Sequence, residues 1–315
     1  MAGRRRFRIL ALSGGGYLGL YTAKVLADLE ARVGEPLGRR FDLIAGTSVG
    51  GILALALAFE VPMSTVLRLF VERGTEIFSP RRLPRGAVTR LLDLSRSVLG
   101  PKYSGTALRR ALSGQLGTRT LGEAIHNVVV PAVNVTDSST KIFKTPHAPL
   151  SRGDESVRAI DVAMATSAAP SYFPSVRIGR ALYADGGLFA VAPDQVALHE
   201  ARHFMGVDPI GIRMVSIGTA VAGYQPSDGV QSDDGAVGWL NEGRLILTML
   251  SVQQQHVQAM TEDLLGDRYL RIDAPWPADA GLGIDVATED AASTLAALAE
   301  WSLSELDPAI LQRFL

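Results

Sequence analysis

Residues 41–53 read FDLIAGTSVGGIL and combine a short apolar run, a serine between glycines and a second apolar run. The first run, residues 41–45, has the length of a buried β-strand. The second, residues 49–59, is made almost wholly of apolar, helix-forming residues. Between them, GTSVG at residues 46–50 fits the G-x-S-x-G pattern of a nucleophile elbow. The stretch therefore predicts a strand, a sharp turn that carries Ser48, and a helix buried on most of its sides.

The two glycines of this pattern have a physical reason in an elbow. A serine held in a strained backbone conformation leaves little room for side chains two residues before and after it, so Gly46 and Gly50 suit those positions. The Ser48 hydroxyl would stand above the sheet, beside a helix N-terminus whose free amides favour negative charge. Because glycine and serine are common, a tight turn without catalysis stays open as an alternative.

Composition narrows the classes of protein. The chain has 315 residues, 47% of them hydrophobic, which is enough for one large α/β domain, and a net charge of -1 that gives no sign of a nucleic-acid partner. It contains no cysteine, which excludes disulfides, thiolate zinc sites and a cysteine nucleophile. We find no signal peptide and no apolar run of spanning length, so we expect a soluble intracellular protein that can still visit a membrane surface. No acidic loop has the ligand spacing of a calcium site, and we expect no cofactor.

A glycine-rich turn follows the strand that we expect over residues 7–12. Gly14, Gly15 and Gly16 precede residues 20–31, whose apolar spacing predicts a helix, and backbone amides in such a turn can hold an anion. One interpretation is a nucleotide phosphate loop. However, Glu35 in a turn is a poor candidate for the acidic residue that a dinucleotide loop needs, and no Walker lysine follows the glycines. Another is an oxyanion hole formed by the three glycine amides, and a third is a plain tight turn.

Strand-like and helix-like segments alternate along the rest of the chain. We expect helices over residues 62–73, 106–112, 160–169, 193–205, 239–265 and 289–306, a helix opening at residues 120–124, and strands over residues 127–135, 141–144, 181–184, 212–217 and 268–272. Residues 74–105 are basic and rich in proline, which predicts an irregular loop or cap. No repeat or linker divides the chain. The sequence therefore predicts a single α/β domain over residues 1–315, with a mostly parallel central sheet and helices on both faces.

Asp185-Gly186-Gly187 is a third motif, and it follows the strand expected over residues 181–184. On its own, Asp-Gly is more typical of a hairpin turn. However, the glycine loop, the serine elbow and this aspartate all come directly after predicted strands, where open α/β sheets place their ligands. The three motifs therefore define one candidate site.

With these motifs in this order, the chain resembles the patatin-like phospholipases. That family carries a glycine-rich oxyanion loop, a G-x-S-x-G elbow and a D-G-G/A motif, and residues 165–174, ATSAAPSYFP, are similar to the segment before its aspartate. The resemblance covers about residues 7–205, whereas residues 206–315 carry no assignable motif. It implies a three-layer sandwich and a dyad without histidine. Ser48 would attack the acyl ester of a membrane lipid, Asp185 would take its proton, and the glycine-loop amides would hold the oxyanion.

Two features refine this resemblance. Leu18 stands where many relatives carry Arg or Lys, so a cation that could contact a lipid phosphate is missing and the headgroup preference is open. Residues 14–23, GGGYLGLYTA, look similar to a subset of bacterial defence phospholipases that cyclic nucleotides switch on. That subset implies a cyclic nucleotide activator, antiphage defence and action at the cytoplasmic face of the membrane. Residues 74–105 and 220–290 are then candidates for nucleotide sensing and for assembly into a homo-oligomer.

Three other functions stay open. His199-Glu200-Ala201-Arg202-His203 matches H-E-x-x-H, which in a zinc metallopeptidase places two histidines on one helix face with the glutamate as base. A Ser-His-Asp triad would need a histidine near Ser48, and the candidates are His126, His147, His199, His203 and His256. A non-catalytic lipid or nucleotide sensor with the same fold would not need Ser48 at all.

Overall fold

The computed structural model describes residues 6–78, 100–226, 235, 238–239, 243–277 and 281–315. Its strands are β1 (Phe7–Leu12), β2 (Leu43–Gly46), β3 (Val128–Asn134), β4 (Ser139–Lys144), β5 (Val176–Ile178), β6 (Ala181–Asp185), β7 (Ile212–Ile217) and β8 (Tyr269–Ile272). Its α-helices are α1 (Gly19–Val33), α2 (Val49–Ala58), α3 (Met63–Ile77), α5 (Thr106–Leu116), α6 (Ala159–Thr166), α7 (Asp194–His199), α9 (Arg244–Leu265), α10 (Glu289–Ser304) and α11 (Pro308–Phe314). The strands and helices alternate over much of the chain, as the sequence predicts.

The described strands form one sheet in the order β5-β6-β3-β2-β1-β7-β8, with β4 also paired to β3. The pairings β1–β2, β1–β7, β2–β3 and β7–β8 are parallel, and Leu10 in β1 lies between Ile44 of β2 and Val215 of β7. The pairings of β4 and β6 with β3, and of β5 with β6, are antiparallel. The expected central sheet of mostly parallel strands is confirmed, with an antiparallel margin on one side.

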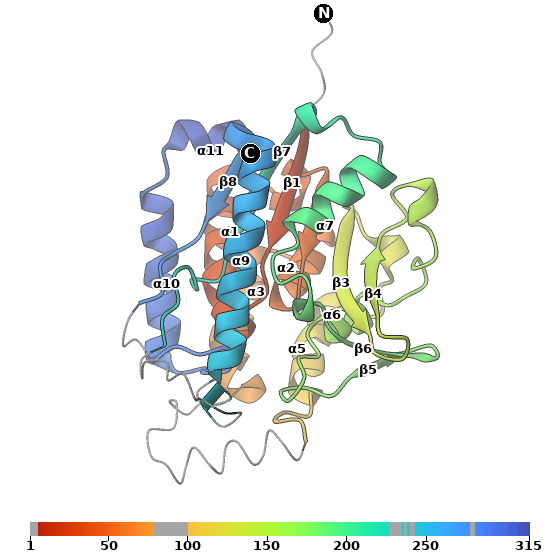
Figure 1. The fold of residues 1–315 in the computed structure, drawn as a ribbon, viewed down its shortest axis with the longest axis vertical. Coiled ribbons are helices and arrows are strands. Elements are labelled where there is room, and N and C mark those ends of the chain that lie inside the picture. Colours follow the sequence, from red (N-terminus) through yellow and green to blue (C-terminus); the bar gives the residue numbers. More distant parts are fainter. Residues whose placement is uncertain (1–5, 79–99, 227–234, 236–237, 240–242, 278–280) are drawn as a thin grey trace, which may run out of the picture.

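Helices cover both faces of the sheet, as alternation along its strands requires. In β1, Leu10 and Leu12 face a core that contains side chains of α1, α2, α3 and α10. Ile9 and Ala11 face a second core, with side chains of α7 and the C-terminal end of α9. Figure 1 shows α7 and α9 in front of the sheet and α2 and α3 behind it. The three-layer sandwich is thus confirmed.

Several elements differ from the sequence expectations. Helix α3 continues to Ile77, so residues 74–77 are helical rather than loop, while residues 79–99 lie outside the described residues. Strand β5 was not expected, because three residues are too few to give a pattern. Helix α11 was also not expected, although Asp307 caps it directly before Pro308, a recognised start signal.

The helix expected over residues 193–205 has two parts: α7 ends at His199 and a π-helix over Glu200–Phe204 continues it. Residues 121–123 form one 3-10 turn with the predicted capping box, in which Thr120 and Glu123 bond each other's backbone. Among the helices that the structure describes, none combines the length and the apolar character needed to cross a bilayer.

Candidate active site

The predicted elbow is present between β2 and α2. Ser48 has φ 56° and ψ -124°, a backbone region that residues other than glycine rarely adopt. A Cβ added to Gly46 would collide with the carbonyl of Gly50, and one added to Gly50 would collide with the carbonyl of Leu12. Backbone packing therefore explains both glycines, and the turn holds Ser48 at the C-terminal edge of the parallel strands.

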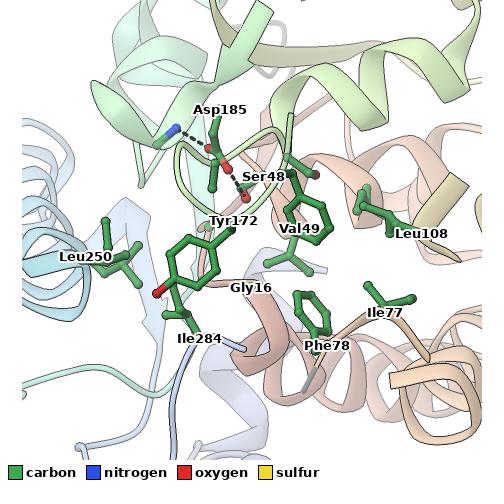
Figure 2. A pocket seen from close by; sticks show the side chains of 18 of the residues that line it. Gly16, Ser48, Val49, Ile77, Phe78, Leu108, Tyr172, Asp185, Leu250 and Ile284 are labelled. Atoms are coloured by element: carbon green, nitrogen blue, oxygen red, sulfur yellow. Dashed lines mark hydrogen bonds between the residues drawn. The ribbon is translucent and has the colours of Figure 1, made fainter. Parts of the chain in front are cut away.

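Ser48 lies within hydrogen-bond distance of Asp185, 137 residues further along the chain. Its Oγ donates to Asp185 Oδ2 at 2.7 Å, and the N–H of Gly187 donates to Oδ1 at 2.7 Å (Figure 2). Asp185 is only 6% exposed. Burial raises the pKa of its carboxyl group to about 6, against the hydrogen bonds from Ser48 and Gly187, which lower it. The structure thus brings the two predicted residues together.

Asp185 reaches Ser48 by a route that the sequence did not predict. Strand β6 is antiparallel to β3, and Asp185 at its C-terminal end lies opposite Ala132 in the middle of β3. The rule that parallel strands meet at their carboxyl ends explains Ser48 and the glycine loop but not Asp185. Asp185 enters the site from the opposite direction, across β3.

The backbone of the elbow is held by a residue that sequence reasoning missed. The Ser48 N–H donates to Thr166 Oγ1 at 2.9 Å, and the Thr166 hydroxyl donates to the carbonyl of Pro131 at 2.6 Å. Thr166 is fully buried at the end of α6. The sequence signal for Thr166 is the segment ATSAAPSYFP, which is similar to the family's segment before the aspartate but assigns no role to the threonine.

The glycine loop lies beside the elbow, and its three amides are not equivalent. The Gly14 N–H donates to the carbonyl of Val191 at 2.9 Å and therefore has a partner within the protein. No hydrogen bond within the described residues is donated by the N–H of Gly15 or Gly16. Of the three predicted oxyanion donors, these two are the ones whose N–H groups remain available to a ligand.

A cavity of about 350 Å³ opens at Ser48 and Asp185. Most of its wall is apolar and comes from α3, α5, residues 169–173 and α9. The side chains include Val66, Phe70, Ile77, Phe78, Leu108, Leu112, Phe173, Leu245, Ile246, Met249 and Leu250. Figure 2 shows Phe78, Leu108 and Leu250 around the space that Ser48 faces. A hydrocarbon chain fits such a wall, and the hydrogen-bonded Ser48 and Asp185 are among its few polar side chains.

The five histidines lie elsewhere, and none of them lines this cavity. His126 Nε2 lies 3.1 Å from Glu60 Oε1, and His147 Nε2 lies 3.0 Å from Glu200 Oε1. Since Ser48 bonds directly to Asp185, the geometry does not support a Ser-His-Asp triad.

The H-E-x-x-H segment is divided between surface and interior. The rings of His199 and His203 stack at 5.1 Å on the exposed face, whereas Glu200 is 2% exposed and accepts from Lys144 Nζ at 2.6 Å. Burial acts to raise the pKa of Glu200, but hydrogen bonds from His147, Lys144 and Ser151 outweigh it and lower the pKa to about 2. No group of three histidine or acidic side chains in the described residues is placed to hold a metal ion. The zinc peptidase geometry is therefore not formed.

A three-layer α/β sandwich, in which a serine elbow faces a buried carboxylate at an apolar cavity, is typical of a lipid acyl hydrolase. The family model described as patatin-like phospholipase matches residues 10–198. The chain therefore belongs to the patatin-like phospholipase family, as its motifs predict, and is an enzyme of the hydrolase class.

Similar proteins extend this match beyond the motifs. The chain is 42% identical to a cGAMP-activated phospholipase of Pseudomonas aeruginosa over 87% of this chain and 80% of that protein. It is 33% identical to a cGAMP-activated phospholipase of Vibrio cholerae over 93% and 89% of the two chains. Among solved structures, VipD from Legionella pneumophila matches with a TM-score of 0.41 and 14% identity, over 94% of this chain and 67% of that one.

Proposed function

We propose that the protein is a phospholipase A-like lipid acyl hydrolase with Ser48 as nucleophile and Asp185 as its base. The observation that carries this proposal is the 2.7 Å hydrogen bond from Ser48 Oγ to Asp185 Oδ2 in the wall of an apolar cavity. A nucleophile must lie within hydrogen-bond reach of its base, and the substrate's acyl chain needs an apolar wall beside them.

The reaction follows from this geometry. As Ser48 Oγ attacks the acyl carbonyl, its proton passes to Asp185 Oδ2, and the tetrahedral intermediate collapses when Asp185 returns that proton to the leaving lysolipid oxygen. A water molecule then attacks the acyl-enzyme and gives a proton to Asp185. When the second tetrahedral intermediate collapses, the bond from the acyl carbon to Ser48 Oγ breaks, Asp185 returns the proton to Ser48 Oγ, and the fatty acid leaves. With a pKa raised by burial to about 6, the carboxylate is ionised at neutral pH and basic enough to accept a proton in the transition state.

Charge develops on the carbonyl oxygen during both attacks. The N–H groups of Gly15 and Gly16 are the donors that we assign to it, since neither is used within the described residues. The N-terminus of α2, which begins at Val49, adds a favourable dipole. Removal of one oxyanion donor typically lowers kcat by about 10²–10³.

We assign the substrate to a bilayer surface. Leu188 and Phe189 directly follow Asp185-Gly186-Gly187 and are 44% and 37% exposed, although both are large and apolar. Leu188 also lines the cavity, so the exposed apolar surface is continuous with its wall. Exposed apolar side chains beside the cavity suit partial insertion into the acyl layer, so that a lipid can enter without crossing water.

The relatives named cGAMP-activated phospholipases cover most of this chain. On that basis we propose a cyclic nucleotide activator, a role in antiphage defence at the cytoplasmic face of the membrane, and self-association on activation. We also propose that residues 1–315 form a single domain, because β7 and β8 from the C-terminal third join the sheet of the catalytic motifs. Parts of the candidate sensing segments, residues 74–105 and 220–290, lie outside the described residues.

Fatty acid release from mixed liposomes tests the proposal. Wild type, Ser48→Ala and the control Ser304→Ala, an exposed serine at the end of α10, are compared with and without cGAMP. We expect release by wild type and Ser304→Ala only, stimulated by cGAMP. Release by Ser48→Ala at the wild-type rate would overturn the assignment of the nucleophile. Equal rates with and without cGAMP would overturn the regulatory part alone.

A further inference from the structure

We propose that Gln253 and Gln254, two consecutive residues of α9, are positioning residues that hold the aspartate loop and the glycine loop of the site in their relative places. The inference rests on the proposed roles of Ser48 and Asp185. Adjacent residues of a helix point in directions about 100° apart, so two neighbouring glutamines can serve two separate loops. The C-terminal third, which carries no motif, thereby gains a function at the active site.

Gln253 binds both ends of the loop over residues 187–191. Its Nε2 donates to the carbonyl of Gly187 at 3.3 Å, and its Oε1 accepts from the N–H of Val191 at 3.2 Å. The same Gly187 donates its N–H to Asp185 Oδ1, and the same Val191 accepts the N–H of Gly14. One side chain amide thus fixes the residue that orients the carboxylate and the residue that anchors the glycine loop.

Gln254 reaches the glycine loop from the other side. Its Nε2 lies 3.4 Å from Thr219 Oγ1, which in turn donates to the carbonyl of Gly14 at 3.3 Å. A Cβ added to Gly15 would collide with this threonine, so the side chain of Thr219 also packs directly against the loop. Gln254 Oε1 accepts from the guanidinium of Arg271, whose other nitrogen donates to Ser13 at 3.3 Å.

These contacts have the properties of support rather than of substrate binding. Gln254 and Thr219 are buried, and neither they nor Gln253 line the cavity. A primary amide is a suitable group at residue 253, because its NH₂ group can donate to a backbone carbonyl while its oxygen accepts from a backbone N–H. Loss of that amide leaves both backbone groups without these partners and frees the loop.

The same helix also forms part of the cavity. Leu245, Ile246, Met249 and Leu250 lie on the N-terminal half of α9 and line the cavity, while the two glutamines follow within a turn of the helix. A rotation or shift of α9 would therefore change the cavity wall and both loops together. Helix α9 is therefore one element through which the C-terminal third supports the proposed reaction.

The test replaces Gln253 with methionine, which keeps the volume and removes both hydrogen-bonding groups. The matched control is Gln255→Met, an exposed glutamine two residues further along whose side chain bonds only Ser251 of the same helix. Hydrolysis of liposomes is measured with cGAMP present. We expect kcat of Gln253→Met to fall about tenfold with little change in KM, the amount that one or two lost hydrogen bonds represent.

A pH profile separates positioning from loss of folded protein. The hydrogen bond from the Gly187 N–H lowers the pKa of Asp185, so displacement of Gly187 in Gln253→Met should raise that pKa. The acid limb of the profile, in which kcat falls as Asp185 becomes protonated, then moves to higher pH. Thr219→Val, which removes the hydrogen bonds to Gly14 and from Gln254 but leaves Gly187 in place, is expected to lower kcat without moving that limb. Thermal melting of each variant establishes that equal amounts of folded protein are compared.

If Gln253→Met and Gln255→Met have the same kcat and the same acid limb, the positioning role is wrong. Should Gln253→Met fail to fold, Gln253→Glu takes its place, since it keeps the acceptor for Val191 and loses the donor to Gly187; an unchanged profile in that variant would equally overturn the role. Retained activity in Ser48→Ala would instead overturn the proposed function. An inactive Ser48→Ala beside a normal Gln253→Met would remove only the role of α9.

Discussion

Asp185, the proposed base, is expected to lower the stability of the folded protein at neutral pH. Its pKa in an unfolded chain has the ordinary value of 3.8, whereas burial raises it to about 6 in the folded protein. At 1.36 kcal/mol per pH unit, the difference of 6 minus 3.8 makes the ionised carboxylate cost on the order of 3 kcal/mol of folding free energy. Asp185→Asn removes that charge and keeps an acceptor for Gly187, so we expect an inactive but more stable enzyme.

The sign of the effect fixes its pH dependence. Since the folded pKa lies above the unfolded one, folded protein loses stability relative to Asp185→Asn as pH rises from about 4 to about 6, and the gap is complete above that range. Below about pH 4 both forms carry a neutral group and the gap closes. Urea unfolding of the two proteins at a series of pH values measures the free energy of unfolding directly.

The matched control is Asp307→Asn. Asp307 is exposed and caps α11 by accepting from the N–H of Ala309, a role that asparagine fills equally well. This control is expected to match wild type at every pH. The reasoning is refuted if Asp185→Asn is less stable than wild type at pH 8, or if its gain is the same at pH 4 and pH 8, because the gain must come from a charge that is present only above the folded pKa.

Four further outcomes follow from the same contacts. The acid limb of kcat should have its midpoint near pH 6 and fall about tenfold per unit below it, because Asp185 must be ionised; a midpoint below pH 5 in the pH–rate profile would contradict this. Gly50→Ala should lower the free energy of unfolding by about 1–3 kcal/mol and abolish activity, since the added Cβ meets the backbone of β1; chemical denaturation and fatty acid release measure both. Phe189→Ser should weaken binding to vesicles in a flotation assay but spare hydrolysis of a soluble short-chain ester. Ile210→Ser, at an exposed apolar residue in the 3-10 turn before β7, should change neither binding nor hydrolysis. Glu200→Gln should lower the free energy of unfolding by about 3–5 kcal/mol in urea unfolding, because it removes the buried negative partner of Lys144, whose side chain is 12% exposed. Metal analysis should find the same zinc content before and after the change.

The proposed catalytic pair could be predicted because both of its members carry local signals. Gly46 and Gly50 are required by backbone packing around Ser48, and Asp185 stands before two glycines, so each leaves a pattern in a few adjacent residues. Strands such as Phe7–Leu12 and Ile212–Ile217 were found for the same reason, as buried parallel strands are continuous apolar runs.

What could not be predicted depends on contacts between distant segments. The direction of β6, the use of the Gly14 N–H by Val191, and the support from Thr166 and Gln253 are set by tertiary packing. Polar side chains such as Thr166 and Gln253 do not recur at a fixed spacing in the sequence, so no periodic pattern reveals them. A run of three glutamines at residues 253–255 inside a helix with an apolar face was a signal, since buried amides need partners, but it names no partner.

Strand β3 separates the strands that carry Ser48 and Asp185, and its length sets their spacing. Val129 of β3 lies beside Ala45 of β2, and Ala132 lies opposite Asp185, so the two pairings are three residues apart. One residue inserted between them would move the carboxylate about 3.3 Å along the strand and turn it to the opposite face of the sheet. The distance between Ser48 and Asp185 therefore depends on an interval of three residues in β3, and an insertion or deletion there is expected to separate the two side chains.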